Sequence, residues 1–491
     1  TDSKVASMRK YFALLIVSSL LFACGGEDSQ QQDAVYVDET DETDETDETD
    51  EEQVLPEIWG APALEDENPD PDVVEVTLRA QENRVSLSED LDADMYTYNG
   101  HLPGPIIQAK VGDRVIVHFE NELPEPTTVH WHGLRISDQM DGSPRIQDPV
   151  EAGESFEYEF VVPEAGSYWY HPHVRTNEQI EKGLYGLLVV HGEDDPEYDA
   201  ERYLTIDDIL IDQNGEFPGF LERHPEIMHG RTGNALLTSG SLDGVEFEAK
   251  QGDVERWRLV NPANARTMSL SIEGASWRVI GTDGGLLEQP YETDRLTLPV
   301  GQRFDVEVTY EDEGQATLFT HVLVQDDNND VVEEPFELAE ASVSSSDKSP
   351  RQIEWPDIEA IDSPEVDDEQ VIEFDVQQTA SGATEWTLNG EANAQDPLFT
   401  FTEGDRVRIR LKNNAGPEHP FHLHGQFFTV VDDGRDWTDQ PGLKDTVLVP
   451  GQEEVEIIAY LDNPGRWMAH CHILEHAELG MMSEIVVEPG E

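Results

Sequence analysis

The stretch from Gly112 to Asn121 reads GDRVIVHFEN and sets the pattern for most of the chain. Apolar and polar residues alternate through it, so every second side chain would face a core, as in a half-buried β-strand. Similar short alternating segments, separated by Gly, Pro, Asn and Asp, fill the body of the 491-residue sequence. Long amphipathic helices are not evident. The sequence therefore predicts an all-β protein.

The markers at the two ends of this stretch recur twice. Gly112-Asp113 is followed by Asn121 nine residues after the glycine, and the same spacing separates Gly252-Asp253 from Asn261 and Gly404-Asp405 from Asn413. Glycines also bracket a strand in each copy, which we predict at residues 155–162, 303–310 and 453–461. Three copies imply three related β-sandwich domains. We place them at residues 70–194, 195–345 and 366–491, with a linker at 346–365.

The N-terminal segment has the features of an export signal. A basic Met8-Arg9-Lys10 precedes an apolar run of about twelve residues that is too short to span a bilayer comfortably. The run ends at Cys24 in a context that resembles the bacterial lipobox. We predict a signal peptide over residues 1–23, starting at Met8, and a lipid on Cys24 that places the protein in a bacterial cell envelope, at the periplasmic face or outer membrane. A plain signal peptide is the alternative.

Strong acidity marks the segment that follows and the rest of the chain. Residues 24–69 contain four repeats of Asp-Glu-Thr, and such a run of like charge predicts a disordered tether. The whole chain has 106 acidic and 30 basic residues, for a formal charge of −76. This charge excludes nucleic acid as a partner, limits membrane contact to the lipid anchor, and suits a saline environment. It says little about the substrate, and we expect a monomer.

Four His-x-His pairs occupy equivalent positions in domains one and three. Alternate residues of a strand point the same way, so each pair directs two imidazoles to one face. Eight imidazoles are too many for one ion and predict a metal cluster between domains one and three. In domain two the same positions hold Leu270, Ile272, Phe319 and His321, so we interpret domain two as a spacer and His321 as a packed or surface residue. The pairs are His130 and His132, His171 and His173, His422 and His424, and His470 and His472.

Domain three adds four residues with a different chemistry. His419, Cys471, His476 and Met481 provide two imidazoles, a thiolate and a distant thioether, which is the ligand set of a blue-copper electron-transfer centre. A structural zinc site needs a closed set of four ligands without a thioether and would leave eight histidines unexplained. The only other cysteine, Cys24, lies in an unrelated context, so a disulfide framework is excluded.

Together these motifs resemble the four signature motifs of the multicopper oxidases, over roughly residues 70–491. The resemblance implies three cupredoxin-like Greek-key domains, as in laccases, bilirubin oxidases and cuprous oxidases, and four copper ions. It assigns His419, Cys471, His476 and Met481 to a type 1 copper and His130 and His422 to a type 2 copper. The type 3 pair would use His132, His171, His173, His424, His470 and His472. Cys471, between two cluster ligands, would carry electrons to dioxygen.

The sequence indicates less clearly which residues would deliver protons to the metal cluster. Asp141 resembles the acidic residue that the family places near the type 2 copper, where a carboxylate can relay protons; a turn residue before Gly142 is the less favoured alternative. Many bacterial members carry a Glu directly after the last type 1 histidine, where this chain has Ala477. Glu478 is the candidate substitute, but an adjacent residue should point elsewhere.

The reducing substrate is inferred from what surrounds the type 1 site. We expect electrons to enter through an exposed edge of His419 or His476. Ala415 and Pro417 stand where cuprous oxidases place acidic and Met ligands, and the chain has only 8 Met, which favours phenols or aromatic amines over Cu(I). Glu418 keeps a cuprous or metal-ion oxidase open as the alternative. A non-enzymatic envelope protein of this fold would have lost ligands, and a two-domain nitrite reductase is disfavoured by the His-Cys-His motif.

Overall fold

A computed structural model describes residues 55–325, 331–361, 365–432, 434–435 and 440–490. The predicted signal peptide, Cys24 and the acidic repeats lie outside these residues, so those interpretations stay predictions. In the described part of the chain, no helix has the length and apolar character needed to cross a membrane.

The first domain is a pair of four-stranded sheets with the orders β3-β2-β5-β7 and β4-β9-β8-β6. One apolar cluster contains residues of both sheets, such as Val117 of β5 and Leu188 of β9. The two sheets therefore pack face to face as a sandwich. Its strands are β2 (Val73–Ser88), β3 (Leu91–Tyr98), β4 (Gly104–Lys110), β5 (Arg114–Asn121), β6 (His130–His132), β7 (Ser155–Val161), β8 (Gly166–His171) and β9 (Gly186–His191).

The second domain pairs a seven-stranded sheet, β1-β10-β13-β18-β15-β16 with β11 beside β10, with a five-stranded sheet, β12-β20-β19-β14-β17. Its core again joins both sheets. The strands are β1 (Ile58–Trp59), β10 (Ala200–Ile209), β11 (Ala235–Thr238), β12 (Val245–Lys250), β13 (Val254–Val260), β14 (Met268–Glu273), β15 (Ser276–Thr282), β16 (Gly285–Glu292), β17 (Leu296–Leu298), β18 (Arg303–Thr309), β19 (Gly314–Gln325) and β20 (Val331–Ser344).

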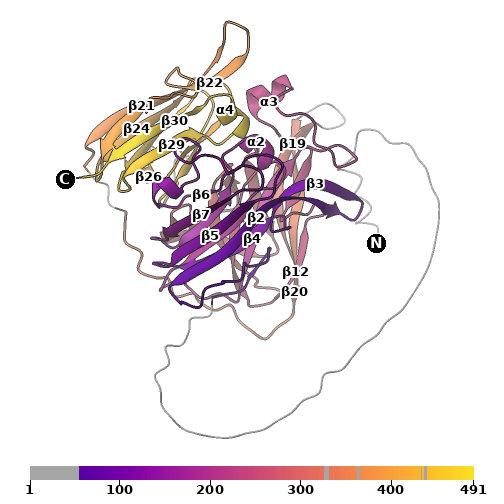
Figure 1. Ribbon diagram of the computed structural model, residues 1–491. Coiled ribbons are helices and arrows are strands. Elements are labelled where there is room, and N and C mark those ends of the chain that lie inside the picture. The colour runs from indigo at the N-terminus through magenta and orange to yellow at the C-terminus, as the bar shows by residue number, and fades with distance from the viewer. Residues whose placement is uncertain (1–54, 326–330, 362–364, 433, 436–439, 491) are drawn as a thin grey trace. The chain divides into compact units, whose positions relative to one another are not determined.

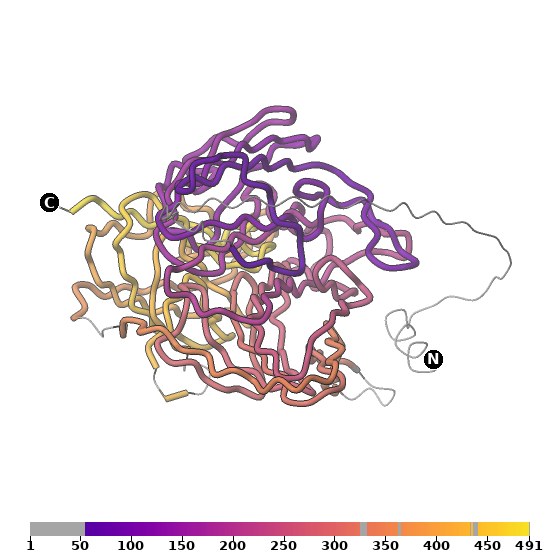
Figure 2. Tube along the Cα trace, turned by 90° about the horizontal axis from the view of Figure 1, so that it is seen from below, coloured from indigo at the N-terminus to yellow at the C-terminus, as the bar shows by residue number. Residues whose placement is uncertain are grey.

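The third domain has two five-stranded sheets, β22-β21-β24-β28-β26 and β23-β30-β29-β25-β27, around a third shared core. In Figures 1 and 2 its yellow strands lie against the indigo and violet strands of the first domain. The strands are β21 (Asp368–Gln378), β22 (Thr384–Leu388), β23 (Phe399–Thr402), β24 (Arg406–Asn413), β25 (His419–Leu423), β26 (Phe427–Val430), β27 (Thr446–Val449), β28 (Glu454–Tyr460), β29 (Gly465–Cys471) and β30 (Met482–Glu488).

Helical structure in the described residues is confined to short segments in loops: η1 (Asp138–Met140), α2 (Thr176–Gln179), α3 (His224–His229) and α4 (Leu474–Glu478). Helix α4 of domain three contacts both α2 of domain one and α3 of domain two. All three domains therefore meet at the loop that follows Cys471.

The all-β class and the three sandwich domains are confirmed, and the repeated Asn has a physical role. In each domain its buried side chain donates to a backbone carbonyl across the loop: Asn121 Nδ2 to Val150 O (2.8 Å), Asn261 Nδ2 to Leu298 O (2.9 Å) and Asn413 Nδ2 to Val449 O (3.2 Å). A buried carbonyl needs such a partner, which explains why the marker recurs at one position of the fold. The predicted strands at 155–162, 303–310 and 453–461 agree with β7, β18 and β28 to within a residue.

The predicted tether is wrong at its C-terminal end. Ile58 and Trp59 pair in parallel with Glu201 and Arg202 of β10, which makes β1 an edge strand of domain two. Ile58 is buried, and the Trp59 ring lies 5.2 Å from that of Phe247. Burial of Ile58, the Trp59 ring contact and the strand pairing together order a segment that the acidic composition around it assigned to the tether.

Candidate metal centre

Strands β25 and β29 place two groups of candidate ligands on opposite faces. Phe421 and Cys471 are cross-strand partners, and both belong to the core of domain three. The next pair, His422 and His470, faces the other way because side chains alternate along a strand. One strand pair thus carries a thiol toward its own core and imidazoles toward domain one.

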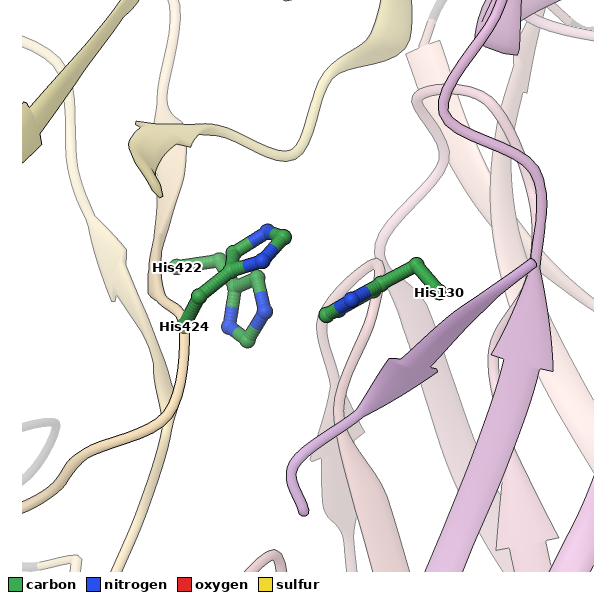
Figure 3. A group of neighbouring side chains, drawn as sticks. All are labelled: His130, His422 and His424. Carbon is green, nitrogen blue, oxygen red and sulfur yellow. The ribbon is translucent and has the colours of Figure 1, made fainter. Parts of the chain in front are cut away.

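The imidazoles of the four pairs meet between domains one and three. All eight are buried, and in Figure 3 His130 points from its side toward His422 and His424. Within this cluster, several overlapping groups of three have ligand nitrogens lying within 4.8 Å of one another, among them His130 with His422 and His424, and His130 with His171 and His173. Two further groups share no histidine with each other, and each of these mixes the two domains. The first triad is His132, His171 and His472, and the second triad is His173, His424 and His470. His130 and His422 are the remaining two.

The other candidate group lies inside domain three. His419 Nδ1 is 3.4 Å and His476 Nδ1 is 3.9 Å from Cys471 Sγ, and the two nitrogens are 3.2 Å apart. Met481 is fully buried in the same core, and its carbonyl accepts the Cys471 amide proton at 3.1 Å. The Trp386 ring lies 3.9 Å from that of His476 and covers it. The three donor atoms converge as a shared metal ion would require.

Unpaired nitrogen atoms test whether the first group fits a metal. His130 Nε2, His422 Nε2 and both ring nitrogens of His173 and His472 are buried with no hydrogen-bond partner among the described residues. Leaving a buried polar atom unpaired is unfavourable, so these atoms are accounted for if they bind metal. Burial also lowers the pKa of His173, His422 and His472, that of His472 to about 3, which keeps these imidazoles in the neutral form that metals bind.

Cys471 connects the two groups through the backbone. Its neighbours in sequence belong to different triads, His470 to the second and His472 to the first. Burial raises the pKa of its thiol, so loss of the proton requires a positive charge close to the sulfur, as a bound metal ion supplies. Two imidazoles and a thiolate with a nearby thioether are the donor set that copper prefers.

Asp141 lies at the cluster, where the sequence predicted it. Its Oδ2 is 2.9 Å from His424 Nδ1 and its Oδ1 is 3.2 Å from His130 Nδ1. Burial raises the pKa of Asp141, but His424 and His130 outweigh burial and hold the net value below the ordinary range. The carboxylate therefore fixes the rotation of His424, as outer-shell carboxylates do in metal sites, and the backbone oxygen of Asp141 does the same for His130, whose Nδ1 lies 2.9 Å from it.

Asp445 has a similar position and was missed from the sequence. Its Oδ1 lies 3.1 Å from His132 Nε2, and its backbone oxygen lies 2.9 Å from His422 Nδ1. The sequence feature that could have indicated Asp445 is the charged pair Lys444-Asp445, which stands directly before strand β27. This strand pairs with β25.

Glu478 is not brought to the cluster. Its side chain is exposed at the end of α4, and no described interaction joins it to a cluster histidine. The buried carboxyl of α4 belongs to Glu475 instead, which accepts from the Arg231 amide (2.8 Å) and from Asn264 Nδ2 (2.9 Å). Burial raises the pKa of Glu475 to about 7. A sequence argument could have found it only by noticing an acid in an otherwise apolar turn.

The expected exposed edge of a type 1 histidine is wrong. His419 and His476 are both 0% exposed. Domain two is the cause, because its helix α3 lies over this site: Trp386 Nε1 donates to Ile227 O (2.8 Å), and Met228 packs against the domain-three core. The loop that carries α3 has no periodic sequence signal that would have predicted this contact.

Three β-sandwiches, a buried Cys-His₂ site with a nearby Met and an adjacent eight-histidine cluster are the features of a copper protein. Three family models described as multicopper oxidase match residues 79–195, 164–339 and 365–491. The multicopper oxidase MmcO of Mycobacterium tuberculosis is 30% identical over 450 residues, covering 84% of this chain and 86% of that protein. The chain belongs to the multicopper oxidase family and is an oxidoreductase.

Solved structures support the same assignment. A multicopper oxidase from Campylobacter jejuni, described as a metallo-oxidase, has a TM-score of 0.76 at 28% identity and covers 89% of this chain and 96% of its own. A laccase-like multicopper oxidase from the lignin-degrading bacterium Ochrobactrum sp., with oxidase activity towards lignin model compounds, has a TM-score of 0.76 at 26% identity, with coverage of 87% and 99%.

Proposed function

We propose that this protein couples one-electron oxidation of a reducing substrate to the four-electron reduction of dioxygen to water. The observation that carries the proposal is the backbone of Cys471, which joins a buried Cys-His₂ site to one member of each histidine triad. An electron accepted at the sulfur is then one residue along the backbone from a ligand of each triad, His470 or His472.

The ligand roles are carried over from the multicopper oxidase motifs, and the two triads that share no histidine support them. His419, Cys471, His476 and Met481 would hold a type 1 copper, the two triads one type 3 ion each, and His130 and His422 the type 2 ion. Copper would supply a one-electron acceptor in the first site and, in the second, a group of ions that passes the electrons taken from the substrate to oxygen. Asp141 orients His130 and His424, and its charge favours cations in the cluster.

Phenols or aromatic amines remain the first candidate reductants. Support comes from the absence of acidic and Met residues at Ala415 and Pro417 and from the lignin-model activity described for the Ochrobactrum relative. Both type 1 imidazoles are buried beneath helix α3. A phenol or aromatic amine would therefore bind on the outer surface of α3, and its electron would pass through this helix to the type 1 site.

Metal-ion oxidation is the second candidate, and the same cover favours it. Helix α3 carries His224, Met228 and His229 above the type 1 site, and imidazole and thioether groups suit copper ions. The Campylobacter relative is described as a metallo-oxidase. Glu418, in contrast, already accepts a hydrogen bond from Thr267 Oγ1 (2.6 Å), which restricts its side chain and makes it a less suitable site for an incoming metal ion.

The test is the visible and EPR spectrum of the copper-loaded protein, with oxygen uptake followed on a phenol and on cuprous ion. We expect an intense charge-transfer band from the Cys471 sulfur, separate type 1 and type 2 EPR signals, and about four coppers per chain. Turnover of the phenol selects the laccase-like reaction, and turnover of cuprous ion alone selects the metallo-oxidase. A colourless protein that consumes no oxygen would overturn the proposal and leave an envelope protein without activity.

A further inference from the structure

Domain two has no His-x-His pair, yet one of its side chains reaches the cluster. Arg303, at the start of β18, is fully buried and binds Asp445 with both arms of its guanidinium: Nη1 to Oδ1 at 2.8 Å and Nη2 to Oδ2 at 2.7 Å. The same Asp445 Oδ1 lies 3.1 Å from His132 Nε2. A side chain of domain two therefore supports a carboxylate of domain three that contacts a ligand of domain one.

Arg303 is itself held on three sides. Its Nε donates to Ser167 O of domain one (3.0 Å) and its Nη2 donates to Asp283 O (3.0 Å), while its amide donates to Asp283 Oδ1 (2.9 Å). A planar fork with this many fixed partners defines the direction of Asp445 more tightly than a single flexible ammonium could.

The residues just before Arg303 contact the cluster as well. A Cβ on Gly301 would lie 2.9 Å from Cδ2 and 3.1 Å from Nε2 of His472, so the bare backbone of this glycine backs the imidazole ring. Its φ of +84° is also a conformation that suits glycine. Gln302 Nε2 donates to Thr446 O (2.5 Å), which ties the same turn to the residue after Asp445.

These contacts converge on one half of the cluster. His132 and His472 both belong to the first triad, whereas the second triad includes His424, which Asp141 orients. Metal-bound histidines usually give their second nitrogen to a carboxylate or carbonyl, which fixes ring rotation and tautomer. Each triad thus has its own supporting carboxylate, and only Asp445 is held by domain two.

We propose that Arg303 and Gly301 are positioning residues of the oxygen-reducing centre, Arg303 by fixing Asp445 against His132 and Gly301 by backing the His472 ring. The proposal rests on the proposed function, in which these histidines bind copper. All three domains then contribute residues that contact the cluster. The interpretation of domain two as a spacer is therefore corrected.

The test compares Arg303→Lys with Arg258→Lys in the full-length protein. Arg258 is a matched control because it is also fully buried in domain two and bonds to Ser167 of domain one, through Oγ at 2.7 Å, but pairs with Glu201 rather than with a residue at the cluster. For each protein we would measure copper bound per chain, the type 2 EPR signal, the near-ultraviolet absorption of the type 3 pair, and urea unfolding without copper.

We expect Arg303→Lys to weaken copper binding in the cluster by about 10-fold to 100-fold and to change the type 2 and type 3 signals, with the visible type 1 band kept. Arg258→Lys should keep all three signals, whatever it does to copper-free unfolding. Unchanged type 2 and type 3 signals in Arg303→Lys, or equal losses in both variants, would overturn the proposal.

Gly301→Ala provides a second route if Arg303→Lys does not fold. The added methyl group must displace the His472 ring, so the type 3 absorption should change while the type 1 band stays; an unaltered type 3 absorption counts against the proposal. A wild-type protein with no type 2 or type 3 signal would instead overturn the proposed function. The two failures are therefore distinguishable.

Discussion

Domains two and three each contain a five-stranded sheet of matching strand order, but domain two lacks the His-x-His pairs that domain three carries there. The ligand-bearing sheet of domain three has the order β23-β30-β29-β25-β27, and domain two has β12-β20-β19-β14-β17 in matching positions. Where β25 and the residue after it carry His422 and His424, β14 carries Leu270 and Ile272. The same strand order forms in domain two without these ligands, so the ligands are not needed to specify it.

Domain two lacks the ligands but still contacts both candidate metal sites. Helix α3 covers the type 1 site, and the turn at Gly301 lies against His472. Domain three supplies ligands from β25, β29 and the residues that follow these strands, whereas domain two supplies cover from helix α3 and support from the turn that leads into β18. Each of the following predictions changes one side of this difference.

The largest effect is expected from giving domain three the residues of domain two. The double variant His422→Leu and His424→Ile removes one imidazole from the type 2 position and one from the second triad, so oxygen uptake should fall to background and the type 2 EPR signal should vanish. The visible band should persist, because His419 and Cys471 lie on the other face of the strands. Loss of that band as well, in a protein that is still folded by circular dichroism, would show that the two faces are not independent.

A smaller effect is expected at the contact between domain two and the type 1 site. Trp386→Phe removes the donor to Ile227 O and should lower the free energy of unfolding by about 1–3 kcal/mol, measured with urea on the copper-free protein. The visible band should also shift, because the indole packs on His476. Trp277→Phe is the control, since it removes a matching bond to Thr293 O (2.8 Å) far from any predicted ligand and should leave the band unchanged.

Sequence reasoning was accurate where a pattern repeats and failed where domains touch. The Gly-Asp and Asn markers located three sandwiches, and the spacing of the histidine pairs predicted a cluster that the structure brings together. Asp445, Arg303 and the cover over His476 were missed because their partners lie in other domains, and no local periodicity records such contacts. Ile58 and Trp59 were assigned to the tether for the same reason, since the strand that pairs with them begins over 140 residues later.

Domain two also buries a titratable group of its own, a carboxyl rather than an imidazole. Burial raises the pKa of Asp207 in β10 well above its ordinary value, and Asp208 beside it adds to the effect. The folded state therefore keeps a proton that the unfolded chain loses above about pH 4, so this group makes stability fall as pH rises. Asp207→Asn should be more stable than wild type at neutral pH, with the difference disappearing near pH 3, as followed by urea unfolding across pH.

Asp212 serves as the control for Asp207, because its pKa is lowered and its effect on stability changes with pH in the opposite direction. Backbone amides of Glu216 and Asn214 lower its pKa, so it stabilises the fold above its unfolded pKa and loses this contribution in acid. Asp212→Asn should therefore be less stable than wild type at neutral pH. Equal pH profiles for the two variants would mean that burial in domain two does not control Asp207.

The smallest effect is expected at the histidine that domain two retains. His321 occupies the position of His472 in the repeat, but its Nε2 lies 2.8 Å from Ser271 Oγ and its ring is partly exposed. His321→Ala should change the free energy of unfolding by about 1 kcal/mol or less and leave copper content unchanged, whereas His472→Ala should abolish the type 3 absorption. Loss of copper from His321→Ala would break the comparison, because domain two would then supply a ligand as well as support.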